Sequence, residues 1–143
     1  MDDLILVVED SDEDFEALRR VLRELAITCS LHRVCDGEDA LGYLYQKNSF
    51  ADAPRPSLIL MDLNLPGTDG REVIQQIKQR DRLKAIPIVV LTTSANPKDI
   101  ETCYFYGANS YLVKPMGIKK LKETIAIFYQ YWFEVGILPS MEN

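Results

Sequence analysis

The chain has 143 residues, a net charge of −6 and an apolar content of 47%. This length suits one globular domain with a sizeable core. The acidic balance argues against nucleic acid as a direct partner, because phosphate binding needs a basic face. No window approaches the roughly 18 unbroken apolar residues of a membrane span, and the start Met1-Asp2-Asp3 does not resemble a secretion signal. We therefore expect neither nucleic acid nor a membrane as partner.

The three cysteines are odd in number and lack the spacing of a metal site. They predict reduced thiols in a cytoplasmic protein. The single histidine, His32, argues against most histidine-based catalysis and metal chemistry, and we expect it to have no special role.

The first half of the chain alternates strand and helix patterns. Residues 4–8 (LILVV) predict a strand, and Phe15, Leu18, Leu22 and Leu25 follow with helical spacing. A second, shorter strand is expected at 30–34, and a helix at about 38–46. A long loop that contains proline, 47–57, then leads into the third strand.

The second half repeats this alternation. Apolar runs predict strands at 58–60, 88–91 and, more weakly, 111–113, with helical spacing at 73–77 and at 118–132. The stronger runs are unbroken, which is typical of strands covered on both faces in a parallel sheet. Five strand–helix pairs in succession predict an α/β fold, the flavodoxin-like doubly wound (βα)5 arrangement with a five-stranded parallel sheet of order 2-1-3-4-5.

We expect residues 1–143 to form a single domain. Its core would span about 4–130, and the tail, about 134–143, would be partly loose. No second domain is expected after the fifth helix, so output would be contact with another protein or onward transfer of a chemical group.

Acidic side chains follow two strands that this order makes neighbours. The first strand ends at Glu9-Asp10 and the third at Asp62. Function in an open parallel sheet lies at these carboxyl ends. Like charges a few ångströms apart repel by about 4 kcal/mol per pair at an effective dielectric near 20, so the cluster must be protonated or hold a cation. The fourth and fifth strands bring Thr92 and Lys114 to the same edge.

An all-oxygen site without histidine favours Mg²⁺ over zinc. A divalent ion with a lysine can also hold a phosphoryl group, and a carboxylate can carry phosphate as an acyl phosphate. Asp62 stands alone at its strand tip and is the better candidate for this role.

Two other chemistries use this edge in similar folds. FMN binding needs a phosphate-cradling loop after the first strand, whereas EDSDED (9–14) would repel a phosphate that no metal neutralises. Phosphatases of the haloacid dehalogenase type place an Asp-x-Asp motif after the first strand, but here the third strand carries Asp62-Leu63-Asn64. Turnover or a flavin's yellow colour would reveal either one, and we expect neither.

The chain resembles the receiver domain of two-component response regulators over about residues 4–130. The resemblance rests on the strand-end residues above and on the phrases DGEDAL (36–41), LPGTDG (65–70) and YGANSYLVKP (106–115). More narrowly, it is similar to stand-alone regulators paired with bacterial phytochrome histidine kinases, in APRPSLILMDLNLPGTDGREVI (53–74), IPIVVLTTS (86–94) and FYQYWFEVGILP (128–139).

The resemblance implies that Asp62 accepts a phosphoryl group from a phosphohistidine on a sensor histidine kinase. It implies that Asp10 and Asp62 bind Mg²⁺ through their side chains, Asn64 through its main-chain carbonyl, and Glu9 through water. Many receivers carry Asp where Glu9 stands, so the longer side chain changes how the metal is held.

The resemblance also implies a switch. Thr92 would hydrogen-bond the phosphoryl group, Lys114 would pair with it, and Tyr111 would turn inward in response. Thr93 stands where a small alanine is common, and its bulk would obstruct the attacking water. We therefore expect a phosphoacceptor signalling protein rather than an enzyme, with only self-phosphorylation from small phosphodonors and slow autodephosphorylation.

Aromatic residues gather near the C-terminus, with nine of the 13 lying between Tyr104 and Phe133. Tyr104, Phe105 and Tyr106 cannot all point inward from one helix, and Ile127 and Tyr131 fall off the apolar stripe of the last helix. A contiguous exposed patch of this kind marks an interface, so we expect a homodimer through residues 104–133. A rival reading from another class is a pseudo-receiver, which keeps the fold as an interaction module without the phosphorylation chemistry.

Overall fold

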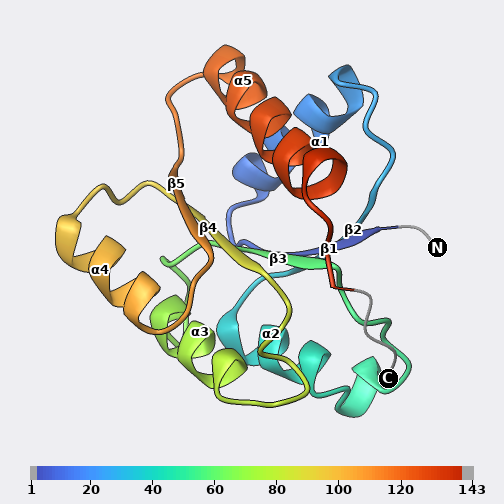
Figure 1. Ribbon diagram of the computed structural model, residues 1–143, viewed down its shortest axis with the longest axis vertical. Coiled ribbons are helices and arrows are strands. Elements are labelled where there is room, and N and C mark those ends of the chain that lie inside the picture. Colours follow the sequence, from blue (N-terminus) through green and yellow to red (C-terminus); the bar gives the residue numbers. More distant parts are fainter. Residues whose placement is uncertain (1–2, 140–143) are drawn as a thin grey trace.

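The computed structural model describes residues 3–139. Five parallel strands form one sheet in the order β2-β1-β3-β4-β5, with helices on both faces (Figure 1). This confirms the predicted fold class and strand order. The strands are β1 (Leu4–Val8), β2 (Ser30–Val34), β3 (Leu58–Met61), β4 (Ile88–Thr92) and β5 (Ser110–Val113). The helices are α1 (Asp12–Glu24), α2 (Gly37–Leu44), α3 (Gly70–Lys78), α4 (Pro97–Phe105) and α5 (Ile118–Tyr129).

Two core clusters lie on opposite faces of the sheet. Leu6, Val8 and Ile59 face α2 and α3, whereas Ile5 and Val7 face α1 and α5. Successive strand residues point to opposite faces of the sheet, so an unbroken apolar run supplies side chains to both core clusters. Burial of each aliphatic side chain contributes about 1.5–3 kcal/mol to the stability of the fold. The central strands therefore form a rigid base for the residues that follow their carboxyl ends.

Besides shifts of one to three residues at other element ends, three features differ from the sequence predictions. Helix α2 ends at Leu44 rather than near Gln46, because Gln46 has a positive φ of 55° and breaks the helical path. The predicted loop 47–57 contains a short 3₁₀ helix, η1 (Asn48–Phe50). The last helix continues as a π-helical turn, η2 (Gln130–Val135), that packs Phe133 on Tyr129. Residues 140–143 of the predicted tail lie outside the described residues.

None of the helices described between residues 3 and 139 combines the length and apolarity that crossing a bilayer requires.

Candidate functional site

Backbone hydrogen bonds carry the sheet one residue beyond the tips of β1 and β3. The Glu9 amide donates to the Val34 carbonyl and the Asp62 amide to the Val8 carbonyl, each at 3.0 Å. The parallel register pairs Val8 with Met61, so the residues that follow them emerge side by side. The sheet therefore fixes the two carboxylates against one another.

Three carboxylates converge at this edge, as the sequence predicted. Oxygens of Glu9, Asp10 and Asp62 all lie within 4.8 Å of one another. Glu9 and Asp62 are each 6% exposed, whereas Asp10 is open to solvent. Buried carboxylates need a partner, and an all-oxygen set with one open side fits a hard divalent cation that keeps some of its water.

Lys114 neutralises this cluster from inside the protein. Its Nζ donates to Glu9 Oε1 and Asp14 Oδ2 at 2.7 Å each, and to Asp62 Oδ2 at 3.0 Å. Burial lowers the pKa of Lys114, but the hydrogen bonds to the three carboxylates outweigh burial and raise its pKa above the usual value. The ammonium therefore stays charged and sits against the candidate acceptor oxygen.

Glu9 is the carboxylate whose titration is most perturbed. Burial raises the pKa of Glu9 to about 7, and the nearby charge of Asp62 adds to the increase, although the hydrogen bond from Lys114 opposes it. Near neutral pH Glu9 is thus partly protonated unless another cation joins the site.

Thr92, Tyr111 and Asn64 are the remaining predicted site residues. Thr92 is fully buried, and its hydroxyl has no hydrogen-bond partner within the described part of the chain. Tyr111 is half-buried, and its hydroxyl donates to the Ser94 carbonyl at 2.9 Å. The Asn64 amide donates to Asp62 Oδ1 at 3.2 Å, which orients the carboxylate. The functional roles of these residues stay predictions.

A glycine lets the helix that follows β3 approach the site. A Cβ atom on Gly70 would lie 2.8 Å from the Asp62 carbonyl oxygen and 2.9 Å from Leu63 Cα, both of them backbone atoms that cannot move aside cheaply. The last residue of LPGTDG therefore permits α3 to begin directly against the acidic edge.

Two contacts near the site were missed by the sequence analysis. Asp14 was not predicted as a site residue, yet it pairs with Lys114, which lies 100 residues away in the sequence, so no local spacing points to the contact. Arg71 bridges α3 to α4 through Asp99 at 2.8 Å, and Asp99 accepts from the Ser94 hydroxyl at 2.7 Å. This second contact joins distant segments, and no local pattern in the sequence predicts it.

Known proteins share this arrangement along most of the chain. The model of one family, the response regulator receiver domain, matches residues 5–126. The chain belongs to this family. Response regulator Rcp1 of Synechocystis sp. is 42% identical over 137 residues, which cover 96% of this chain and 93% of Rcp1.

Solved structures of receiver domains agree with the fold. The crystal structure of the phosphorylated cyanobacterial phytochrome response regulator RcpA superposes with a TM-score of 0.93 at 38% identity, covering 98% of this chain and 100% of RcpA. The Mn²⁺-bound form of Rcp1 gives a TM-score of 0.90, covering 96% of this chain and 99% of that one. These relatives confirm the predicted resemblance to phytochrome-associated receivers.

Proposed function

We propose that Asp62 accepts a phosphoryl group from a phosphohistidine of a sensor histidine kinase in the cytoplasm, and that the chain, one receiver domain with its core at about 4–130, then signals by protein contact. One observation carries the proposal: the carboxylate of Asp62, which is only 6% exposed, lies 3.0 Å from the largely buried ammonium of Lys114 and beside two further acids. Such crowding is costly for the fold, and a phosphoryl-accepting role accounts for it.

The transfer balances without any further reactant. An Asp62 carboxylate oxygen forms a bond to phosphorus while the P–N bond to the imidazole breaks. The electron pair of that bond stays on the imidazole nitrogen. Lys114 pairs with the transferred group and stabilises its charge. Hydrolysis later breaks the P–O bond and returns inorganic phosphate and the free carboxylate.

The donor set fits Mg²⁺. Asp10 and Asp62 would hold the ion through their side chains, Asn64 through its main-chain carbonyl and Glu9 through water; once bound, the ion would supply charge neutralisation at the phosphoryl oxygens. The exposure of Asp10 beside two buried acids supports this assignment, because it leaves one side of the cluster open to hydrated ions.

The switch begins with the unpartnered hydroxyl of Thr92. A buried hydroxyl without a partner costs free energy, and a phosphoryl group on Asp62 would give it one. Movement of Thr92 toward that group frees space for Tyr111, which leaves the Ser94 carbonyl and turns inward. The surface of α4 and β5 then changes, with a coupling on the order of 1–3 kcal/mol.

The kinase would dock beside Asp62. A cavity of about 330 Å³ opens there between α1 and α5, with Phe15, Leu18 and Ile118 among the apolar residues that line it. A helix of the partner could bring its phosphohistidine to Asp62 along this opening. The relatives linked by name to phytochromes support a phytochrome as the kinase, which a phosphotransfer assay with a purified phytochrome kinase tests directly.

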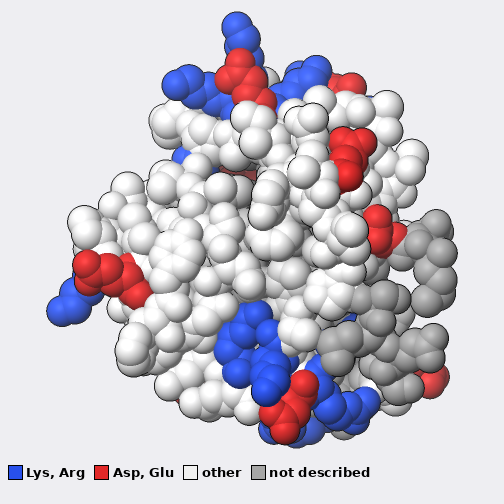
Figure 2. All heavy atoms as spheres, in the orientation of Figure 1, with Lys and Arg blue, Asp and Glu red and all other residues white. Residues whose placement is uncertain are grey.

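Homodimerisation would use the region 104–133. Phe105 is 85% exposed and Ile127 69%, and Tyr104 and Tyr131 are also exposed. Figure 2 shows a largely uncharged surface over β5 and the C-terminal half of α5. An apolar patch of this kind suits a second copy of the chain. Sedimentation at high concentration, with and without phosphorylation, tests this, and a monomer in both states contradicts it.

Acetyl phosphate tests the central proposal without a kinase. With Mg²⁺ present, intact mass should increase by one phosphoryl group in the wild type and stay unchanged in Asp62→Asn. Glu72→Gln, a charge-neutralising change on the exposed side of α3, serves as the control and should be phosphorylated normally. A wild type that gains no mass would favour the pseudo-receiver.

A further inference from the structure

An arginine of β2 lies beside the segment that carries the exposed acid of the site. Arg33 precedes Val34, which pairs with Val8 at the tip of β1. The side chain of Arg33 is only 19% exposed, which is low for an arginine. The phosphoryl transfer proposed above does not involve this residue.

The guanidinium of Arg33 forms hydrogen bonds on both sides of Asp10. Its Nε donates to the Glu9 carbonyl at 2.9 Å, and its Nη1 donates to Asp12 Oδ1 at 2.7 Å. The Glu9 carbonyl belongs to the peptide group that joins Glu9 to Asp10, and Asp12 is the first residue of α1. One side chain therefore holds the backbone immediately before Asp10 and the start of the helix that follows it.

Glu9 is tied to β2 through both of its backbone polar groups. The Glu9 amide donates to the Val34 carbonyl at 3.0 Å, and the Glu9 carbonyl accepts from Arg33. The Glu9 side chain is held as well, since its Oε2 accepts from the Ser11 amide at 3.1 Å. The backbone hydrogen bonds of a segment fix its course, so β2 sets the direction in which the chain leaves the sheet toward Asp10.

The surroundings of Arg33 are not those of a residue placed for stability alone. Its guanidinium carbon lies 5.1 Å from the centroid of the Phe15 ring, which covers it from α1. Its Nη2 is buried and has no hydrogen-bond partner within residues 3–139. A buried donor without a partner costs free energy, so the contacts of Nε and Nη1 must account for an arginine at this position.

The charge of Arg33 is unfavourable for a cation at the acidic edge. A guanidinium bonded to the Glu9 carbonyl repels a divalent ion held by the neighbouring Asp10. Removal of this charge should, by itself, raise the affinity for Mg²⁺. Loss of the hydrogen bonds should lower it, because partners that orient metal ligands contribute about 10–100-fold to metal affinity. The two effects have opposite signs, so one measurement separates them.

We propose that Arg33 is a positioning residue of the acidic site, which holds the peptide group between Glu9 and Asp10 so that the Asp10 carboxylate meets the ion together with Asp62. This inference rests on the proposed Mg²⁺ site and extends it to a residue that contacts neither the ion nor the phosphoryl group. Nε and Nη1 belong to one planar fork and reach two acceptors at once, which the single nitrogen of a lysine cannot do.

Calorimetric titration with Mg²⁺, without any phosphodonor, tests the proposal. Arg33→Gln should bind Mg²⁺ about tenfold or more weakly than the wild type, although it removes a repelling charge. Arg33→Lys keeps that charge and should also bind about tenfold more weakly, because the fork is lost. An unchanged or higher affinity in Arg33→Gln would overturn the proposal, and so would wild-type affinity in Arg33→Lys.

Arg20 provides the matched control. Its Nε also donates to an acid, Glu24 Oε2 at 2.8 Å, but this pair lies on the exposed face of α1. Arg20→Gln and Arg20→Lys should each keep the affinity for Mg²⁺ within about twofold of the wild type. Equal losses in the Arg33 and Arg20 variants would overturn the proposal.

The Mg²⁺ dependence of phosphorylation separates positioning from a general loss of structure. With acetyl phosphate, Arg33→Gln should need about tenfold more Mg²⁺ for its half-maximal rate. At saturating Mg²⁺ it should reach the wild-type rate, because Asp62 and Lys114 are unchanged. A lower maximal rate with an unchanged Mg²⁺ requirement would show that Arg33 acts only on the fold.

Hydrogen exchange in EDTA gives a readout without metal. The Glu9 amide should exchange faster in Arg33→Gln than in the wild type, whereas the Asp62 amide, which donates to the Val8 carbonyl, should keep its protection. Equal exchange of the Glu9 amide in the two proteins would overturn the proposal. A wild type that binds no Mg²⁺ would instead contradict the proposed metal site, so the two failures can be told apart.

Discussion

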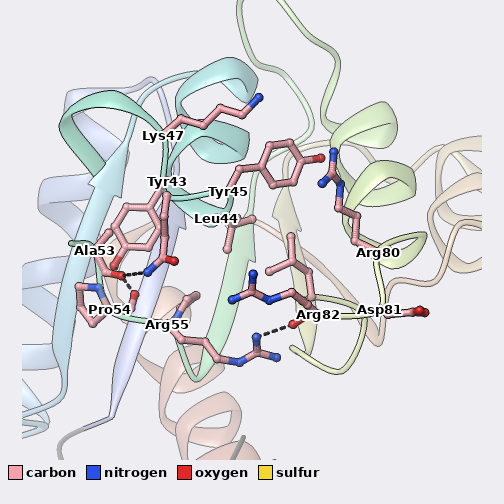
Figure 3. Close-up of a pocket in the computed structure, with 13 residues that line it drawn as sticks. Tyr43, Leu44, Tyr45, Lys47, Ala53, Pro54, Arg55, Arg80, Asp81 and Arg82 are labelled. Carbon is pink, nitrogen blue, oxygen red and sulfur yellow. Dashed lines mark hydrogen bonds between the residues drawn. The ribbon is translucent and has the colours of Figure 1, made fainter. Parts of the chain in front are cut away.

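The two ends of the sheet carry opposite charge and handle it in different ways. At the carboxyl ends of the strands, Glu9 and Asp62 are buried and share the ammonium of Lys114. At the other end, Arg55 and Arg82 line an open cavity of about 380 Å³ between α2 and the segments that lead into β3 and β4, and the carboxylate of Asp81 points away from it (Figure 3). The acidic end thus has its cation, Lys114, directly after β5 of the same sheet, whereas the basic end gathers like charges along an open cavity.

The two ends of the sheet differ because different parts of the backbone position the acidic residues and the basic residues. Register and backbone hydrogen bonds place Glu9 and Asp62, so these two acids cannot separate without breaking the sheet. The basic residues instead stand on loops and helix ends, where like charges can be tolerated with more solvent around them. Changes at the acidic end should therefore affect stability much more than changes at the basic end.

Removing the internal cation should have the largest effect. Lys114→Met leaves Glu9 and Asp62 buried without a counter-ion, so we expect the free energy of unfolding in EDTA to fall by about 3 kcal/mol. Urea denaturation at pH 8 measures this. Mg²⁺ should restore part of the loss, since it also neutralises the carboxylates.

Lys122→Met is the control for that variant. Lys122 also forms an ion pair with a glutamate, Glu24, at 3.4 Å, but both side chains are well exposed. Exposed pairs contribute at most about 1 kcal/mol. Equal losses in the two variants would mean that Lys114 does not hold the acidic edge together.

Glu9 should make stability depend on pH. Because its pKa is raised from 4.5 to about 7 in the folded protein, the folded state binds more protons than the unfolded state between these values. Its contribution is full below pH 4.5 and is lost as pH rises through about 7. Between pH 5.5 and 8 in EDTA, the wild type should therefore lose on the order of 2 kcal/mol relative to Glu9→Gln.

Urea denaturation of both proteins at the two pH values gives that difference. Glu72→Gln, at an exposed position of α3, should instead follow the wild type at both pH values. Parallel pH profiles for the wild type and Glu9→Gln would show that Glu9 titrates normally and is not held in the buried cluster.

Added Mg²⁺ should stabilise the wild type by a smaller amount. With the ion at tenfold its dissociation constant, the gain is about 1.4 kcal/mol. Asp10→Asn should lose most of this gain, because it removes a proposed ligand, whereas Asp52→Asn, an exposed acid near η1, should keep it. Thermal melting with and without Mg²⁺ measures the shifts, and an undiminished gain in Asp10→Asn would exclude Asp10 as a ligand.

The contrast between the two ends also explains what the sequence could predict. Apolar runs and parallel topology lead from Glu9-Asp10 and Asp62 to one edge, because strand ends in a doubly wound sheet have few possible neighbours. The same rule predicts that Thr92 and Lys114 lie at this edge. The acidic site was therefore predictable in composition and place.

The basic cavity was not predictable. Arg55, Arg80 and Arg82 lie on the segments that lead into the neighbouring strands β3 and β4. Strand order brings these segments to one edge, but no spacing in the sequence encodes the loop conformations that leave a cavity between them. The same reason hid the bond from Asp14 to Lys114, since long side chains span distances that strand and helix periods do not describe.

The smallest effect is expected at the basic end. Arg82→Gln should change the free energy of unfolding by less than about 0.5 kcal/mol, with a slight gain favoured because repulsion of Arg55 is relieved. The backbone carbonyl of Arg82, which accepts from Arg55, is kept in this variant. Urea denaturation in a buffer without phosphate measures the change. A loss above about 1 kcal/mol would mean that the Arg82 side chain supports the fold, and the contrast between a neutralised and an open end of the sheet would then fail.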